Sequence, residues 1–215
     1  MKYKKSIFQK YLKSKKNPYL YDIFKESRLY ASNYTELNDL EEGYFYYGVN
    51  EKKDMSDIES VFSQKLECRI CSFSKGRKGD FNPLMWAHYA DGGRGIMINF
   101  KINEPAVIDK VKYDGHYHYD QEEDIREIFI HKVRAWNYEK EYRVITKKTY
   151  VKIKIESVVL GPRFNSSSEY ICTVPDGGMV KSISIKELLE ENNIPVFKAA
   201  EYYNRYIFVN NPLSY

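Results

Sequence analysis

The segment from Trp136 to Ile145, with the sequence WNYEKEYRVI, places the strongest constraint on how this chain can fold. Side chains alternate between the two faces of a strand, so Glu139, Glu141 and Arg143 would share one face. Two carboxylates and a guanidinium are costly to bury unless they pair with each other or meet a ligand. The segment therefore predicts either a strand face with ion pairs along it or a ligand site.

The composition of the chain is notable for its aromatic residues. The 215 residues, enough for one large domain, include 21 tyrosines and 11 phenylalanines. Tyrosine joins a large apolar body to a polar tip, which suits half-buried strands and clefts that stack planar ligands. The net charge of +4 comes mostly from lysines between Lys2 and Lys16. It does not create the global basic field of a nucleic-acid-binding protein.

The cysteines and the hydropathy bear on compartment and partners. Three cysteines (Cys68, Cys71 and Cys172) with no preceding signal peptide predict a reducing cytoplasm and no disulfide framework. The Cys68-x-x-Cys71 pair lacks the second pair of ligands that zinc sites carry, so no metal is expected. No apolar run approaches the roughly 20 residues of a membrane span, which predicts a soluble protein without a membrane partner.

Apolar spacing and turn residues predict an α+β fold, with a central mixed or mostly antiparallel sheet flanked by helices. No linker or internal repeat divides the chain, so we expect a single domain over 1–215. Helices are expected as two short segments within 1–24 and at 54–66, 83–91, 122–136 and 184–192. Strands are expected at 28–32, 68–74, 95–100, 107–113, 136–145, 150–155, 157–161 and 195–200.

Common enzyme signatures are missing. Ser72 and Ser74 share one face of an expected strand, but no GxSxG turn surrounds them. The Gly-Gly-Arg-Gly run at 92–95 lacks the GxxxxGK[ST] pattern of a phosphate-binding loop. These two segments therefore predict neither a hydrolase nucleophile nor a P-loop.

Histidines offer two further candidates. His88 lies on the expected helix three residues before Asp91, where it is either a structural residue or an acid–base group. His116 and His118 lie in an expected loop, which is either a polar hairpin tip or a metal or acid–base pair. The sequence leaves these alternatives open.

Six ordered motifs resemble a bacterial family known as domain of unknown function 2971. They are Leu29-Tyr-Ala-Ser32 with Asn38-Asp39, Cys71-Ser-Phe-Ser74, Met85-Trp-Ala-His88-Tyr-Ala-Asp91 with Gly95-Ile-Met-Ile-Asn-Phe100, Val111-Lys-Tyr113, Trp136-Asn-Tyr-Glu139-Lys-Glu141-Tyr-Arg143 and Val158-Val-Leu-Gly161. The resemblance covers 28–161, with a helical segment over 1–24 before it and a completion over 162–215 after it. Leu40 stands where that family usually has a proline. The family name implies no activity.

The order of Arg28, Ser72 or Ser74, and Glu139-Lys-Glu141 also resembles that of ADP-ribosyltransferases. This resemblance implies an ADP-ribosyltransferase-like fold and an ADP-ribosyltransferase or NAD glycohydrolase-like effector with NAD as its substrate. Glu141 would stabilise an oxocarbenium-like transition state and Glu139 would orient a protein or nucleic-acid acceptor. The implied catalytic residues are Glu141, Glu139 and His88; the implied cofactor-binding residues are Arg28, Tyr30, Ser72, Ser74, Trp86, Tyr89 and Arg143. The site would lie where the Ser72 strand, the Trp86–Asp91 helix and the Glu139–Arg143 strand converge.

Two other functions fit the same residues. In a metal-independent effector that cleaves RNA or nucleotides, His88 would be the acid–base group and Arg94 and Arg143 would bind phosphate. In a non-enzymatic module, a tyrosine-rich cleft would bind a nucleotide or a protein, while Glu139, Glu141 and Arg143 would form a structural ion-pair network. A role as a defence or toxin-like effector would be consistent with a cytoplasmic bacterial protein.

Overall fold

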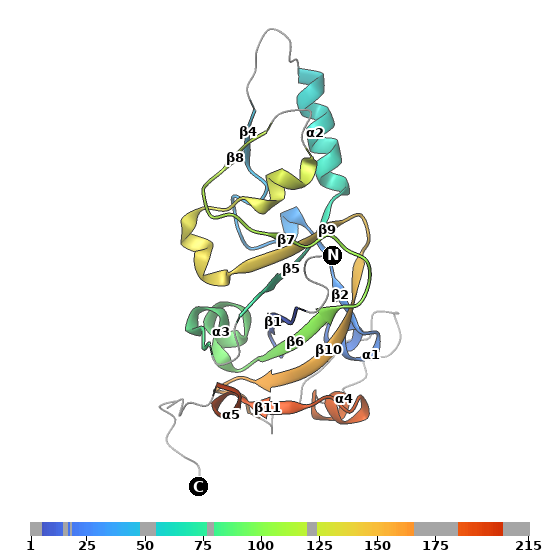
Figure 1. Ribbon diagram of the computed structural model, residues 1–215, viewed down its shortest axis with the longest axis vertical. Coiled ribbons are helices and arrows are strands. Elements are labelled where there is room, and N and C mark those ends of the chain that lie inside the picture. Colours follow the sequence, from blue (N-terminus) through green and yellow to red (C-terminus); the bar gives the residue numbers. More distant parts are fainter. Residues whose placement is uncertain are drawn as a thin grey trace. The chain divides into compact units, whose positions relative to one another are not determined.

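The computed structural model describes residues 6–14, 17, 19–47, 55–76, 80–119, 124–165 and 185–203 (Figure 1). They form two compact units. Among the described residues, unit 1 is built from 30–74 and 104–151, and unit 2 from 6–29, 75–103 and 152–203. Both units combine segments distant in sequence, which explains why no linker is visible in the chain.

Unit 1 is built on antiparallel strands. Strand β5 (Arg69–Ser74) pairs with β3 (Ser32–Asn33) and with β9 (Glu141–Thr146), and β9 also pairs with β7 (Asp109–Lys110). A second, two-stranded sheet pairs β4 (Phe45–Tyr47) with β8 (Tyr117–Tyr119) in parallel. The β5–β9 register places Ser72 opposite Arg143 and Ser74 opposite Glu141.

The helices of unit 1 close its apolar core. Helix α2 (Met55–Glu67) is accompanied by the 3-10 helices η1 (Tyr34–Glu36), η3 (Ile125–Ile130) and η4 (Arg134–Glu139). Val61, Tyr119 and Ile128 form one buried cluster, and Cys68, Ile70 and Phe129 form another. Cys68 therefore packs in the core, and it and Cys71 are both buried free thiols.

Unit 2 has strands in the order β11-β10-β6-β1. Strand β6 (Ile96–Ile102) is antiparallel to β1 (Phe8–Leu12) and to β10 (Tyr150–Leu160), while β11 (Val196–Lys198) is parallel to β10. The short strand β2 (Arg28–Tyr30) also pairs with β10. The helices of this unit are α1 (Tyr19–Lys25), α3 (Pro83–Tyr89), the 3-10 helix η2 (Asp91–Gly93), α4 (Ile185–Glu191) and α5 (Ala199–Tyr203).

The α+β class with mostly antiparallel strands is confirmed. Two expected helices are wrong. Residues 8–12 form β1, because Phe8 and Tyr11 are buried in a strand that pairs with β6. Residues 122–136 do not form one helix: η3 ends at Ile130 and η4 begins at Arg134.

Several expected boundaries also shift. The strand expected over 136–145 begins only at Glu141, because Glu139 ends η4 and Lys140 adopts a left-handed conformation with φ 47°. Residues 150–160 form one strand with a bulge rather than two strands. Within the described ranges, no helix is both long and apolar enough to cross a membrane.

Candidate functional site

Arg143 lies at the centre of a buried charged network in unit 1, and its side chain is 0% exposed. Its two terminal nitrogens donate to both carboxylate oxygens of Glu42, at 2.6 and 2.7 Å, and its Nε donates to Glu141 Oε1 at 2.8 Å. Further bonds run from Nη2 to Glu141 Oε2 and from Nη1 to the Phe129 carbonyl. These bonds occupy all five N–H donors that an arginine carries.

Lys132 extends the network toward η4. Its ammonium lies 2.9 Å from Glu139 and 3.0 Å from Glu141, with Asp39 at 3.8 Å. It also lies 5.1 Å from the centroid of the Trp136 ring, a cation–π distance. Two buried cations thus hold four carboxylates, from Asp39, Glu42, Glu139 and Glu141.

Local backbone geometry brings these carboxylates together. The left-handed turn at Lys140 lets Glu139, at the end of η4, and Glu141, at the start of β9, reach the same ammonium. Glu42 comes from a turn in which its amide donates to the Asp39 carbonyl at 3.2 Å. Gly43 follows with φ 71°, and a side chain there would meet the Phe129 ring at 2.9 Å.

The network keeps its charges ionised. Burial by itself raises the pKa of Glu141, but the charges of Arg143 and Lys132, together with hydrogen bonds from Arg143 and the hydroxyl of Ser72, hold that pKa well below its ordinary value. Burial lowers the pKa of Arg143, yet Glu141 and Glu42 raise it above its usual value. The Glu141 amide donates to the Tyr113 hydroxyl at 2.8 Å, and burial raises the pKa of that phenol. Glu141 is therefore a carboxylate surrounded by donors of its own chain.

The residues implied by the sequence divide between the units. In unit 1, Glu139, Glu141, Arg143 and Ser72 gather in the network, and Ser74 is buried on the same strand as Ser72. Tyr30, also in unit 1, lies 3.4 Å from Glu36 through its hydroxyl.

The remaining implied residues belong to unit 2. The Arg28 Nε donates to the buried Asp22 at 3.0 Å, and the Trp86 indole donates to the Tyr203 hydroxyl at 3.3 Å. His88 and Tyr89 lie on α3. Arg28 and Trp86 thus have structural partners within unit 2.

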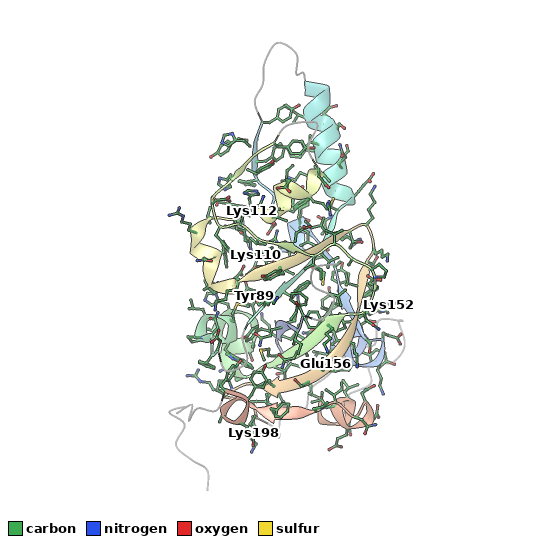
Figure 2. All side chains as sticks on the ribbon, viewed as in Figure 1. Tyr89, Lys110, Lys112, Lys152, Glu156 and Lys198 are labelled. Carbon is green, nitrogen blue, oxygen red and sulfur yellow. The ribbon has the colours of Figure 1, made fainter. Side chains whose placement is uncertain are left out.

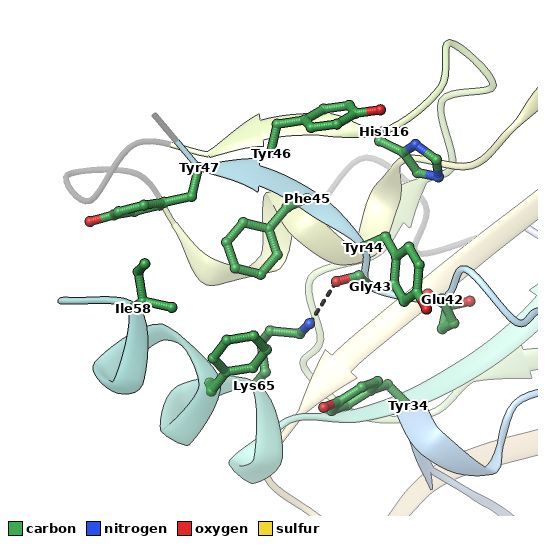
Figure 3. A pocket seen from close by; sticks show the side chains of 11 residues that line it. Tyr34, Glu42, Gly43, Tyr44, Phe45, Tyr46, Tyr47, Ile58, Lys65 and His116 are labelled. Atoms are coloured by element: carbon green, nitrogen blue, oxygen red, sulfur yellow. Dashed lines mark hydrogen bonds between the residues drawn. The ribbon is translucent and has the colours of Figure 1, made fainter. Parts of the chain in front are cut away.

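Sequence reasoning missed an aromatic cavity in unit 1, which we call the β4 pocket. Its volume is about 420 Å³, and it is lined by Tyr34, Glu42, Gly43, Tyr44, Phe45, Tyr46, Tyr47, Ile58, Phe62, Lys65 and His116. Figure 3 shows Phe45 directed toward α2, while Tyr46 lies on the opposite side of β4. The run Gly43-Tyr-Phe-Tyr-Tyr47 was the available signal in the sequence.

Lys65 is the basic residue of the β4 pocket, and it is 3% exposed. Its ammonium donates to the Gly43 carbonyl at 2.6 Å (Figure 3). It lies 4.8 to 6.0 Å from the ring centroids of Tyr34, Phe45, Phe62 and Phe129. Burial lowers its pKa, and Glu42 opposes that effect. No carboxylate of the described residues lies within ion-pair distance of it.

The histidines expected in one loop lie apart in structure: His116 lines the β4 pocket, whereas His118 lies in strand β8. His118 stacks on Tyr46 with ring centroids 4.9 Å apart, and His116 lies 3.2 Å from Glu41. In the part of the chain that the structure describes, no cluster of three metal-ligating side chains occurs. Cys172 lies outside the described residues.

Comparison of the chain with protein-family models, with curated proteins and with solved structures gives no match.

Proposed function

We propose that this protein is a non-enzymatic module that binds a nucleotide in the β4 pocket. One observation carries the proposal: aromatic rings surround a buried ammonium, that of Lys65, which has one hydrogen-bond acceptor among the residues that the structure describes. A lysine carries three donors, so two of them remain for a ligand. A ligand with a planar base and a phosphate would use both the rings and the ammonium.

The dimensions and the exposure of the pocket support a small ligand. A volume of about 420 Å³ lies in the range of roughly 300–1,000 Å³ found for small-molecule sites. Tyr44 and Phe62 are 59% and 47% exposed, so their rings are accessible for stacking. Stacking on aromatic rings tolerates any base, because every base has a π-face.

The charged network supports binding rather than catalysis. Glu42 lines the pocket, and its carboxylate is held on both oxygens by Arg143. Glu141 accepts from Arg143 and pairs with Lys132, so its oxygens have partners within the chain. A carboxylate engaged in this way fixes the pocket wall more readily than it stabilises a passing oxocarbenium ion.

Calorimetric titration of the purified chain with AMP, ATP and NAD tests the proposal. We expect binding of at least one nucleotide, weakened about tenfold or more in Tyr44→Ala and Lys65→Met, because stacking and charge contacts contribute on that scale. Tyr19→Ala is the matched control, since Tyr19 is an exposed tyrosine of unit 2. Thermal melting of each variant checks that it is folded. Absence of nucleotide binding, or wild-type affinity in both variants, would refute the proposal.

Two enzymatic assays separate the proposal from the hypotheses that the sequence raised. If the wild type releases nicotinamide from NAD and Glu141→Gln does not, the transferase or glycohydrolase hypothesis replaces the binding-module proposal. Degradation of RNA without NAD, lost in His88→Ala, would replace it with the nuclease hypothesis. We expect neither activity.

A further inference from the structure

Three buried polar side chains form a row across unit 2. In the strand registers, Gln9 of β1 and Ser157 of β10 both lie opposite Asn99 of β6. The bulge in β10 between Ile155 and Ser157 sets this register. Gln9, Asn99 and Ser157 are 4%, 3% and 9% exposed, respectively. Such a row within an otherwise apolar strand needs partners for its polar atoms.

Asn99 is the centre of the row. Its Nδ2 donates to the Ser157 hydroxyl at 2.9 Å, and its Oδ1 accepts from Gln9 Nε2 at 3.4 Å. The Tyr202 hydroxyl of α5 donates to the same oxygen at 3.2 Å. These bonds orient the Gln9 amide, but they do not use Gln9 Oε1 or the Ser157 hydroxyl proton. Among the described residues no donor reaches Gln9 Oε1 and no acceptor reaches the Ser157 hydroxyl proton.

Both residues line a cavity of about 410 Å³. The remaining wall residues are Ile7, Gly76, Asn99, Glu156, Pro195, Phe197, Glu201 and Tyr202. Phe197 and Tyr202 supply aromatic rings whose centroids are 6.1 Å apart. The wall thus offers an acceptor, a donor and two rings, which is what a planar heterocycle with hydrogen-bonding edges requires.

Charge restricts the ligand further. The titratable side chains of the wall are Glu156, marked on β10 in Figure 2, with Glu201 and Tyr202, and no lysine or arginine of the described ranges lines the cavity. Lys101 and Lys154 pair with Glu156 at 3.1 and 3.8 Å from outside the wall. An anionic ligand would meet two carboxylates and no cation, in contrast to the β4 pocket with its Lys65.

We infer that the cavity beside Gln9, Asn99 and Ser157 is a second binding site, for an uncharged heterocycle of the nucleobase class. Gln9 Oε1 accepts a hydrogen bond from the heterocycle and the Ser157 hydroxyl donates one to it. Phe197 and Tyr202 contact its planar body. The inference is independent of the nucleotide proposed for the β4 pocket, because the two cavities share no residue.

The probes are adenosine, guanosine, cytidine and uridine, with AMP as the charged comparator, followed by ligand-observed NMR and calorimetry on the whole chain. We expect at least one nucleoside to bind. Ser157→Ala removes the donor, and Gly76→Ala places a methyl group 2.2 Å from Gln9 Oε1 unless that amide moves. Each should weaken binding about tenfold, the usual scale for one lost hydrogen bond.

Controls separate this site from the β4 pocket. Ser63→Ala, at an exposed serine of α2, should keep wild-type affinity for the nucleoside. Phe197→Ala, at a residue 39% exposed, gives a third variant at the rim whose folding does not depend on the buried row. Melting curves confirm that each variant is folded.

Three results would overturn the inference. One is the absence of binding for all four nucleosides. Another is unchanged affinity in Ser157→Ala, Gly76→Ala and Phe197→Ala. The third is equal affinity of AMP and adenosine for the Lys65→Met variant. Equal affinity would show that the negative charge of a phosphate does not weaken binding at this cavity.

Discussion

Each unit buries a polar cluster, but the two clusters are built from different chemistry. Unit 1 buries ions: Arg143 and Lys132 hold four carboxylates. Unit 2 buries neutral groups, with the amide of Asn99 joining Gln9, Ser157 and Tyr202. Ions lose more solvation free energy on burial than amides or hydroxyls, so only the ionic cluster needs nearly complete internal pairing.

This difference distinguishes side chains that stabilise the fold from side chains that are available to bind a ligand. All five donors of Arg143 are occupied within the chain, which leaves none for a ligand. The neutral row leaves Gln9 Oε1 and the Ser157 proton without a partner among the described residues, and both residues line a cavity. The residues whose types look most catalytic in the sequence are thus best suited to hold the fold, and less conspicuous amides are better placed for binding.

The largest effect is expected from Arg143→Met. The substitution leaves the carboxylates of Glu42 and Glu141 buried without their guanidinium, so it should lower the free energy of unfolding by about 3–5 kcal/mol. Urea denaturation followed by circular dichroism measures the loss. Arg94→Met is the control, because Arg94 is 52% exposed and its ion pair with Asp91 should contribute about 0–1 kcal/mol. Equal losses in the two variants would remove the distinction between the clusters.

The second prediction concerns acid. The folded-state pKa of Glu141 lies below the unfolded value, so the carboxylate stabilises the fold above the ordinary glutamate pKa of 4.5. That stabilisation is lost progressively as the pH falls below this value toward the lower folded pKa. Between pH 5 and pH 3, as an approximate window, the free energy of unfolding should fall more steeply in wild type than in Glu141→Gln.

Glu67→Gln is the control for the acid titration. Lys147 lowers the pKa of Glu67 as well, but this pair is exposed, and solvent screens it. Its removal should leave the acid slope almost unchanged. If Glu141→Gln and wild type have parallel slopes, the network does not keep Glu141 ionised in the folded state.

The third prediction tests the neutral row with Asn99→Leu. Gln9, Ser157 and Tyr202 each lose a partner, and the cost of unsatisfied buried groups should lower the free energy of unfolding by about 1–3 kcal/mol. Chemical denaturation beside Asn103→Leu, at an exposed asparagine, gives the comparison. A loss as large as that of Arg143→Met would mean that ionic and neutral clusters are equally costly to break.

The sequence predicted the fold class and the core strands because their signals are local. The apolar run at 95–100 and the alternation at 68–74 correspond to β6 and β5. Residues 8–12 were wrongly predicted as helix because Phe8 and Tyr11 fit helical spacing. Their strand conformation depends on pairing with β6, which lies about 90 residues away in the sequence. Tertiary context overrides a short local pattern here.

The candidate sites show the same limit. Period-two spacing correctly indicated that Glu141 and Arg143 interact. Glu139 joins them through a left-handed turn at Lys140, which no sequence pattern predicted. Glu42 lies 101 positions from Arg143, and Ser157 lies 58 positions from Asn99. Such partners are set by strand register and turn geometry, which one sequence does not display.

The smallest effect, and the sharpest comparison, comes from one serine in each cluster. Ser72→Ala removes a hydroxyl that helps to lower the pKa of the charged carboxylate of Glu141, whereas Ser157→Ala removes a hydrogen bond between neutral groups. Polar interactions with ions contribute about 1.5–3 kcal/mol and neutral hydrogen bonds about 0.5–1.5 kcal/mol, so Ser72→Ala should destabilise the protein by roughly 1 kcal/mol more. Denaturation curves of the two variants at pH 7 measure this difference. Repeating them in a Glu141→Gln background should abolish it, because both hydroxyls would then interact with neutral groups. A difference that persists in that background would assign the effect to packing instead of charge.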